Sequence, residues 1–422
     1  MPNFTEHSKK SLLLLVLFYL DQKSIVLMIV FFLSACGGSG GGGALDDVVN
    51  DSRKIASPAS SDSQSESDQQ IEHWGLSRVS PDSVNLPESA VDKIIDYVFT
   101  DAATQSVVVS KGGYVVGERY AEGYDANSVG TSWSVAKSFY SAAIGVAISD
   151  GYYSSVGQRA SSVLTEFINT DKEEITIEQI LRMRSGLAAD TNVFFSGDQT
   201  AHALANTLRT PPGTAFKYSN ANSQLFEPLI RRATGINAHG YLIEKILRPI
   251  GIDPINVGLW FDETGSHPMT YCCIDMRADD FLRFGLLYAR GGRWQGTQVV
   301  PKGYVDASLT PVGFYGYQWW AMNEEYFRRP VRGDISSAIG LDGQRILIWP
   351  EQDIVVVVLT MYQHFANQGY VLNVKGNALN YPNTCKARNN CPAAAEDVSS
   401  GNAVPSYDTH ALVELIVDLA TD

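Results

Sequence analysis

The sequence Thr131-Ser132-Trp133-Ser134-Val135-Ala136-Lys137-Ser138 leads into the apolar run Phe139–Ile148. An apolar run of this length predicts a buried helix, which would begin close to Ser134. Residues three apart lie on one face of a helix, so we expect the Ser134 hydroxyl and the Lys137 amine to meet. The amino-terminal end of a helix also offers unpaired N–H groups and partial positive charge. The stretch therefore predicts a nucleophilic hydroxyl, a base for its proton and backbone donors for an oxyanion.

A Ser-x-x-Lys spacing is weak evidence by itself, because it arises by chance in chains of this size. Here it occurs once, and Tyr218-Ser219-Asn220 supplies further candidates between a turn signal at residues 211–214 and a predicted helix. The Tyr218 hydroxyl can pass a proton between Ser134 and a leaving group. The Asn220 amide can hold both Lys137 and a substrate carbonyl. The predicted catalytic residues are therefore Ser134, Lys137 and Tyr218, with Asn220 as a substrate-positioning residue.

A third element is needed to place a backbone N–H opposite Ser134. The segment Ala338-Ile339-Gly340-Leu341-Asp342-Gly343-Gln344 leads into the predicted strand Gln344–Trp349. Glycine in such a segment lets a substrate come close to the backbone. We therefore expect Gly340 to line the site beside Ser134.

These motifs, in this order, resemble the serine hydrolases of the class C β-lactamase and penicillin-binding-protein superfamily. The resemblance runs from about Val107 to Thr360. Its further landmarks are the segments Thr176–Leu187, Pro212–Asn220, Asp279–Leu287 and Tyr315–Trp320. The resemblance implies a β-lactamase/transpeptidase-like fold and an acyl-enzyme on Ser134. It also implies that the backbone N–H groups of Ser134 and Leu341 form the oxyanion hole.

One departure from the family pattern bears on the substrate. Members that process β-lactams usually carry Lys-Thr-Gly, or a variant with His, where this chain has Ala338-Ile339-Gly340. The missing cation normally meets the substrate carboxylate, so its absence argues against β-lactams and D-Ala-D-Ala peptides. The Gly-Leu-Asp-Gly-Gln form is more similar to the esterase and 6-aminohexanoate-dimer hydrolase branch. The predicted reaction is hydrolysis of ester or amide bonds in a small molecule.

Two alternatives stay open at this point. The first is a true β-lactamase or D-Ala-D-Ala carboxypeptidase. The second is a catalytically silent binding or sensor domain on the same fold, since fold does not fix function. A hydrolase of the Ser-His-Asp type is disfavoured, because the Gly-x-Ser-x-Gly sequence occurs only at Gly37–Gly41, inside a glycine-rich stretch.

Hydrophobic periodicity predicts early strands, a helical middle and late strands. The elements expected outside the middle are a helix at Ser89–Phe99, a hairpin of Ser106–Ser110 and Tyr114–Tyr120, strands at Gln344–Trp349 and Ile354–Thr360, and a helix at His410–Leu419. The helices expected in the middle are Thr176–Arg184, Ala201–Leu208, Ser223–Thr234, Tyr241–Leu247 and Ala278–Tyr288. This order predicts an α+β fold, a central antiparallel sheet flanked by helices with an inserted all-helical subdomain at about 154–293.

Composition narrows the partners. The chain has 422 residues, 45% hydrophobic, which is ample for a buried core. Its formal net charge of −14 argues against binding to nucleic acid, because the phosphate backbone would be repelled. The sequence contains neither Cys-x-x-Cys nor His-Glu-x-x-His, so we expect no zinc site and no cofactor. The expected partner is a small ester or amide substrate.

The amino-terminal residues resemble a targeting segment rather than part of the fold. Residues 1–35 combine early lysines, an apolar run and small residues directly before Cys36, as in the signal peptides of bacterial lipoproteins. We expect cleavage before Cys36 and lipidation of its thiol; an uncleaved membrane anchor is the alternative. Residues 36–70 then form a Gly- and Ser-rich tether, and residues 71–422 form the hydrolase domain. The predicted product is an exported, membrane-attached lipoprotein, periplasmic or at the outer membrane.

Four further cysteines would meet an oxidising compartment after export. Cys385 and Cys391 bracket a short polar loop and are the favoured pair. The adjacent Cys272 and Cys273 could bond elsewhere, bond to each other or stay reduced, and the sequence leaves this choice open.

Overall fold

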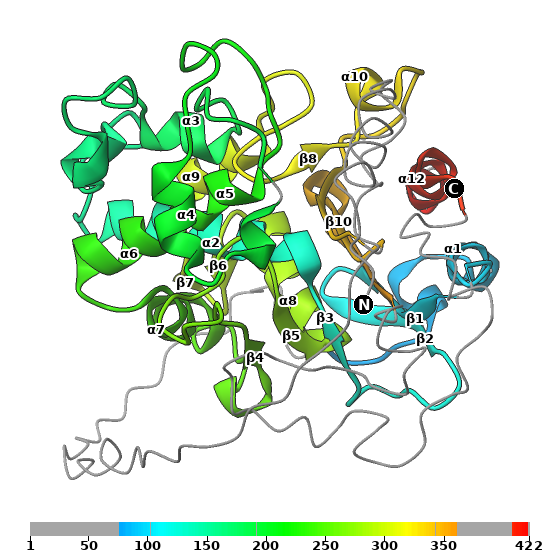
Figure 1. The fold of residues 1–422 in the computed structure, drawn as a ribbon. Coiled ribbons are helices and arrows are strands. Elements are labelled where there is room, and N and C mark those ends of the chain that lie inside the picture. Colours follow the sequence, from blue (N-terminus) through cyan, green and yellow to red (C-terminus); the bar gives the residue numbers. More distant parts are fainter. Residues whose placement is uncertain (1–75, 102, 191, 342, 361–406, 421–422) are drawn as a thin grey trace, which may run out of the picture. The chain divides into compact units, whose positions relative to one another are not determined.

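The computed structural model describes residues 76–101, 103–190, 192–341, 343–360 and 407–420, which belong to the same structural unit (Figure 1). The predicted signal segment, the tether with Cys36, and the pair Cys385 and Cys391 lie outside these residues. Within the described ranges, no helix combines the length and the apolar character needed to cross a bilayer.

Strands from both ends of the described chain form an antiparallel sheet. In spatial order these strands are β2 (Tyr114–Tyr120), β1 (Thr104–Lys111), β11 (Ile354–Thr360), β10 (Arg345–Trp349), β9 (Ser336–Ile339) and β8 (Trp320–Ala321). β11 lies between β1 and β10, and all seven of its residues are buried. A strand that is covered on both faces can be uniformly apolar. The predicted hairpin, here β1 and β2, and the predicted strand Ile354–Thr360 are therefore confirmed.

One face of this sheet is covered by the helix α8 (Ala278–Ala289). Gly285 lets α8 approach closely, because a Cβ there would lie 2.6 Å from Val355 Cγ1 and 2.8 Å from Ile346 Cγ2. The helix α2 (Ala136–Ser149) shares this core, through Phe139 stacked on Phe284. The nucleophile-bearing segment therefore rests on a closely packed layer.

The opposite face is covered by the two terminal helices. α1 (Glu88–Val98) buries Val91, Ile94, Ile95 and Val98, which share one side of the helix. α12 (Thr409–Asp418) packs against α1, although some 300 residues separate them in the chain (Figure 1). Sheet and helices together give an α+β fold with one antiparallel sheet between helical layers, as predicted.

The middle of the chain is mostly helical. Its helices are α3 (Ile177–Leu181), α4 (Gln199–Ala205), α5 (Asn220–Gln224), α6 (Phe226–Thr234) and α7 (Ala238–Leu242), with a π-helical turn at Ile243–Leu247. A single helix was expected over Ser223–Thr234, but a break at Leu225 separates α5 from α6. Pro228 has no N–H to donate to the carbonyl four residues earlier, which weakens the helix at this point.

The middle is not entirely helical, which corrects one sequence expectation. β4 (Gly258–Leu259) and β5 (Ile274–Arg277) pair with each other, and β5 also pairs with β3 (Val129–Thr131) directly before the nucleophile segment. Strands of two to four residues carry too little alternation to be recognised from sequence. The elements still to be named are the hairpin β6 (Arg293–Trp294) and β7 (Thr297–Gln298), and the helices α9 (Lys302–Leu309) and α10 (Glu324–Phe327).

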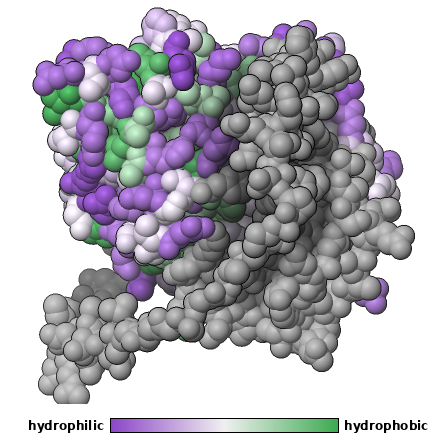
Figure 2. Space-filling view, viewed as in Figure 1, coloured by the Kyte–Doolittle hydropathy of each residue, from purple (hydrophilic) through white to green (hydrophobic). Residues whose placement is uncertain are grey.

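The described part of the surface in Figure 2 is mostly hydrophilic, with smaller hydrophobic areas between. The large apolar side chains that are exposed to solvent are far apart in the sequence; examples are Ile168 at 44% and Ile255 at 69% exposure. Isolated apolar side chains of this kind are normal on protein surfaces.

Candidate active site

Ser134 lies in a 3-10 turn at Trp133–Val135, directly before α2. The sequence predicted an α-helix from Ser134 onward; the α-helix instead begins at Ala136. We call residues 132–135 the nucleophile turn. Trp133 adopts a φ of +43°, a conformation that non-glycine residues rarely take and that often marks functional sites. The turn leaves Ser134 partly exposed, while its neighbours Trp133 and Val135 are buried.

The Lys137 amine forms three short polar contacts. Lys137 Nζ lies 2.8 Å from Ser134 Oγ, 2.9 Å from Asn220 Oδ1 and 2.7 Å from the carbonyl oxygen of Tyr271. Lys137 itself is 1% exposed. Its amine is therefore held in one place by groups from three separate parts of the chain.

Burial sets the protonation state of this amine. Loss of solvent lowers the pKa of Lys137 well below its ordinary value. Within the described part of the chain, no carboxylate forms an ion pair that would offset this effect. A neutral amine has two N–H donors and one lone pair. Its donors match Asn220 Oδ1 and the Tyr271 carbonyl, and its lone pair matches the Ser134 hydroxyl.

Tyr218 is a second polar neighbour of Ser134. Its side chain is hydrogen-bonded to Ser134, and the Lys137 amine lies 4.9 Å from the centre of its ring. Burial raises the pKa of Tyr218, and the hydrogen bond to Ser134 acts in the opposite direction. The ring packs against Trp320, with 5.6 Å between ring centres. Tyr218 is therefore a neutral phenol at neutral pH, fixed beside the Ser134 hydroxyl.

Asn220 is positioned by the start of α5. Ser219 caps this helix by accepting a hydrogen bond from the Asn222 N–H, which fixes the first turn that contains Asn220. The Ser219 hydroxyl also accepts from the Asp190 N–H at 3.1 Å. The capped turn places the side-chain amide oxygen of Asn220, Oδ1, beside the Lys137 amine. From the sequence, Asn220 was expected to hold Lys137, and in the structure these two side chains are in contact.

Gly340 directly follows β9 and lies against the nucleophile turn. Within β9, β8 pairs with Ser336 and Ser337, which leaves the end of β9 facing that turn. A Cβ on Gly340 would lie 2.6 Å from the Ser132 carbonyl oxygen and would also contact the Gln344 side chain. The Gly340 N–H donates to the Gln344 carbonyl and is therefore not the oxyanion donor. Leu341 follows at the same end of the strand, half-buried.

The Gly340→Ala variant is expected to lower kcat/KM for an ester substrate by about 10- to 100-fold. The added methyl group would push the end of β9 away from the nucleophile turn, and misplacement by about 1 Å costs rates of this order. Gly303→Ala is the matched control, because a Cβ at Gly303 in α9 would meet no atom of the described part of the chain within 4 Å. Steady-state kinetics on both variants check the result; equal activities would contradict the close approach at Gly340.

Comparison with known protein families agrees with this geometry. The family model described as "Beta-lactamase" matches residues 92–373, which is most of the chain and includes every residue of the candidate site. The chain belongs to the beta-lactamase family. It is thus a serine hydrolase of this family, and its fold is of the β-lactamase/transpeptidase type.

Individual relatives of this beta-lactamase family member are distant. A 6-aminohexanoate-dimer hydrolase from Paenarthrobacter ureafaciens is 24% identical over 65% of this chain and 78% of its own length. A solved structure from Bacillus anthracis, provisionally named a 6-aminohexanoate-dimer hydrolase, has a TM-score of 0.57 at 19% identity and covers 78% of this chain and 81% of its own. A class C beta-lactamase mutant has a TM-score of 0.51 at 16% identity, over 65% and 91% of the two chains. The two solved structures establish the shared fold.

Two features of this beta-lactamase family site were missed by sequence reasoning. The carbonyl of Tyr271 contacts Lys137, although a backbone acceptor leaves no trace in sequence. Cys272 and Cys273, the next two residues, form a disulfide with each other. The adjacent cysteines were noticed in the sequence, but nothing in the sequence placed them beside Lys137. The tertiary structure therefore decides that Cys272 and Cys273 bond to each other, a choice that the sequence left open.

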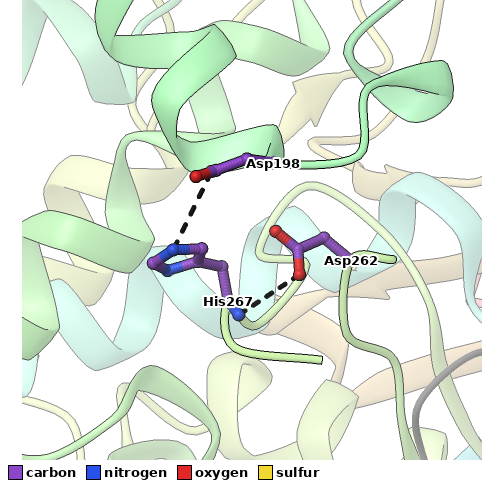
Figure 3. Close-up of side chains that lie close together, drawn as sticks. All are labelled: Asp198, Asp262 and His267. Atoms are coloured by element: carbon purple, nitrogen blue, oxygen red, sulfur yellow. Dashed lines mark hydrogen bonds and ion pairs between the residues drawn. The ribbon is translucent and has the colours of Figure 1, made fainter. Parts of the chain in front are cut away.

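A second polar cluster lies apart from Ser134 and consists of Asp198, Asp262 and His267 (Figure 3). Their potential ligand atoms lie within 4.8 Å of one another. Asp198 caps α4 through the Ala201 N–H, and Asp262 accepts from the Gln199 N–H and the Thr264 hydroxyl. The His267 N–H donates to Asp262, and its ring lies 3.8 Å from Asp198. Because the carboxylates already cap a helix and a turn, we interpret the cluster as structural.

Proposed function

We propose that this protein hydrolyses ester or amide bonds of a small substrate through an acyl-enzyme on Ser134. The observation that carries the proposal is the 2.8 Å contact between Ser134 Oγ and a buried Lys137 amine that forms no ion pair with any carboxylate of the described residues. A hydroxyl needs an adjacent base to become a nucleophile at neutral pH. Membership of the beta-lactamase family supports the same reaction class.

In the first step the Ser134 oxygen bonds to the substrate carbonyl carbon while its proton moves to the neutral Lys137 amine. Asn220 and the Tyr271 carbonyl hold that amine in place. Negative charge develops on the substrate oxygen, and the backbone N–H groups of Ser134 and Leu341 are the proposed donors to it. Donors of this kind typically contribute a hundredfold or more in rate, on the order of 3 kcal/mol each.

In the second step the tetrahedral intermediate collapses and the bond to the leaving group breaks. Tyr218 is a neutral phenol beside Ser134, so it can donate a proton to the departing alcohol or amine. Its proton is replaced by the one that Lys137 accepted. Water then attacks the acyl-enzyme by the reverse sequence of proton transfers, which releases the acid and restores Ser134.

Three classes of substrate test the preference: p-nitrophenyl esters, linear amides and a chromogenic cephalosporin. We expect turnover of short p-nitrophenyl esters and linear amides in preference to a chromogenic cephalosporin. The reason is the apolar Ala338-Ile339-Gly340 segment at the end of β9, which offers no cation to a substrate carboxylate. The 6-aminohexanoate-dimer hydrolase relative supports trying linear amides. Rapid cephalosporin turnover would overturn this preference, and absence of turnover together with absence of Ser134 labelling would favour a binding or sensor domain.

The pH profile of kcat/KM is expected to rise at a pH well below 10 and then level off. The neutral form of Lys137 is the base, so activity rises as pH increases through the pKa of Lys137, which burial lowers. The pKa of Tyr218 is raised, so its proton is retained and causes no alkaline loss below about pH 10. Rates with a non-ionising ester between about pH 5 and about pH 10 check this. An acid limb centred near the ordinary lysine value would contradict it.

We also propose that the chain is exported and attached to a membrane through lipidated Cys36. The support is the sequence before and after Cys36 alone. Metabolic labelling with a palmitate analogue, compared between wild type and Cys36→Ala, tests this. Equal labelling of the two would overturn the anchor without affecting the proposed chemistry.

A further inference from the structure

The disulfide between Cys272 and Cys273 lies next to one of the groups that contact the Lys137 amine. Tyr271, whose carbonyl lies 2.7 Å from Lys137 Nζ, is the residue before Cys272. Cys272 is 1% exposed and Cys273 is 0% exposed. The disulfide is therefore buried in the same segment as the Tyr271 carbonyl, which accepts a hydrogen bond from Lys137.

The same segment is hydrogen-bonded to the nucleophile turn. The pairing of β3 with β5 continues past the strands, where the Ser132 N–H donates to the Ile274 carbonyl at 2.8 Å. The Ile274 N–H donates to Ser132 Oγ at 2.8 Å, and the Cys273 N–H donates to the Trp133 carbonyl at 3.4 Å. The disulfide segment thus supports the nucleophile turn on one side and Lys137 on the other.

Both sides of this pairing hold a rarely occupied backbone conformation. Cys273 has a φ of +81°, and Trp133 opposite it has a φ of +43°. An L-residue in this region costs on the order of 1 kcal/mol or more and persists only where its surroundings hold it. A disulfide between adjacent residues closes a small ring through their shared peptide. It therefore removes much of the freedom by which Cys273 could return to an ordinary φ.

We propose that the Cys272–Cys273 disulfide is a positioning element for Lys137. It holds the Tyr271 carbonyl where this group accepts a hydrogen bond from the Lys137 amine, and so keeps the amine directed at Ser134. The inference rests on the proposed role of Lys137 as the base. Without the ring, the 271–273 segment relaxes, the carbonyl leaves the amine, and Lys137 keeps Asn220 as its side-chain partner.

The expected kinetic signature is a loss of kcat with little change in KM. The disulfide is buried behind Lys137, so its removal weakens proton transfer rather than substrate binding. Misplacement of a catalytic group by about 1 Å costs up to about 100-fold, and we expect kcat to fall by about 10- to 100-fold. KM is expected to stay within about twofold, because an interaction made only in the transition state affects kcat selectively.

The first measurement establishes the bond in the folded protein. Purified full-length protein is unfolded in guanidinium chloride with iodoacetamide present and no reductant, so that buried thiols would react, and is then digested and mapped by mass spectrometry. The expected result is an unalkylated peptide around Cys272 and Cys273 that carries two hydrogens fewer than the dithiol form. Recovery of that peptide with both cysteines alkylated overturns the inference and leaves the proposed hydrolase function standing.

The second measurement compares the double variant Cys272→Ala/Cys273→Ala with Met276→Ala. Met276 is buried in β5 opposite Gly130, so its truncation loosens the same strand without touching the disulfide. We expect the double variant to lose kcat as stated and Met276→Ala to keep it, with thermal melting showing that both are folded. Equal kcat losses, or no loss in the double variant, overturn the inference.

A third measurement uses the wild-type sequence, so that it does not depend on the variant folding. Protein reduced with tris(2-carboxyethyl)phosphine, and verified by the alkylation map, is assayed and then reoxidised. Reduction should lower kcat and reoxidation should restore it; unchanged kcat in verified dithiol protein overturns the inference. A fluorophosphonate probe on untreated protein separates the two proposals, because failure to label Ser134 contradicts the hydrolase itself rather than the role of the disulfide.

Discussion

Ester hydrolysis by the Ser134→Ala variant is expected to be at least about a thousandfold slower than by wild type. The Ser134 oxygen forms the acyl bond in the proposed mechanism, and no residual path through the acyl-enzyme remains without it. Removal of the nucleophile in serine hydrolases with a comparable arrangement costs rates of this order or more. Steady-state turnover of a p-nitrophenyl ester and loss of fluorophosphonate labelling measure the effect.

The control for this variant is Ser141→Ala, in the helix α2 that directly follows the nucleophile turn. Ser141 is fully buried; its hydroxyl donates to the Tyr317 carbonyl at 2.9 Å and lies 3.0 Å from the Tyr304 hydroxyl, so its removal deletes hydrogen bonds between α2 and its surroundings. The loss of one such bond costs about 1 kcal/mol of stability and should leave kcat unchanged. Ester hydrolysis retained in Ser134→Ala would contradict the assignment of the nucleophile.

The Lys137→Met variant is expected to lose about 10²- to 10⁴-fold in kcat, the contribution typical of a general base. Methionine fills much of the buried volume of the lysine side chain but cannot accept the Ser134 proton. Its substitution also leaves Asn220 Oδ1 and the Tyr271 carbonyl without their partner, at about 1–3 kcal/mol of stability each. Kinetics and thermal unfolding together separate the catalytic loss from the structural one.

Lys172 offers a closely matched control. It is also buried, burial also lowers the pKa of Lys172, and its amine donates to the carbonyls of Leu204 and Asn206 at 2.7 and 3.2 Å. Lys172→Met should therefore destabilise the protein to a similar extent without lowering kcat. A comparable kcat loss in both variants would assign the effect of Lys137 to folding rather than to proton transfer.

The sequence predicted much of the fold because the elements concerned are long and strongly patterned. The buried face of α1 and the uniformly apolar β11 are local signals that need no knowledge of their partners. The short strands β3 and β5 were not predicted, because three or four residues carry no readable period. The order and spacing of the motifs sufficed for the α+β fold, which the structure and the family match bear out.

The contacts of the candidate site are likewise of two kinds, those set by local spacing and those set by the tertiary structure. Ser134 and Lys137 lie three residues apart, so local geometry alone brings them together. Asn220 is 83 residues from Lys137 and Tyr271 is 134 residues from it, and the sequence could not give their distances. Asn220 was predicted from its amide chemistry and from its place between a turn signal and a helix, and the family resemblance agreed. The Tyr271 carbonyl is a backbone atom, so its contact had no residue type to reveal it.

By itself, the sequence determined the Ser-x-x-Lys pair, its polar companions and the absence of a cation at Ala338-Ile339-Gly340. Only the tertiary structure decided that Lys137 is buried and unpaired with any carboxylate of the described residues, and that Cys272 and Cys273 form a disulfide next to the carbonyl that contacts it. The physical reason is that spacing along a helix is a short-range property of the chain. Desolvation and the direction of a backbone carbonyl depend instead on every segment packed around the lysine.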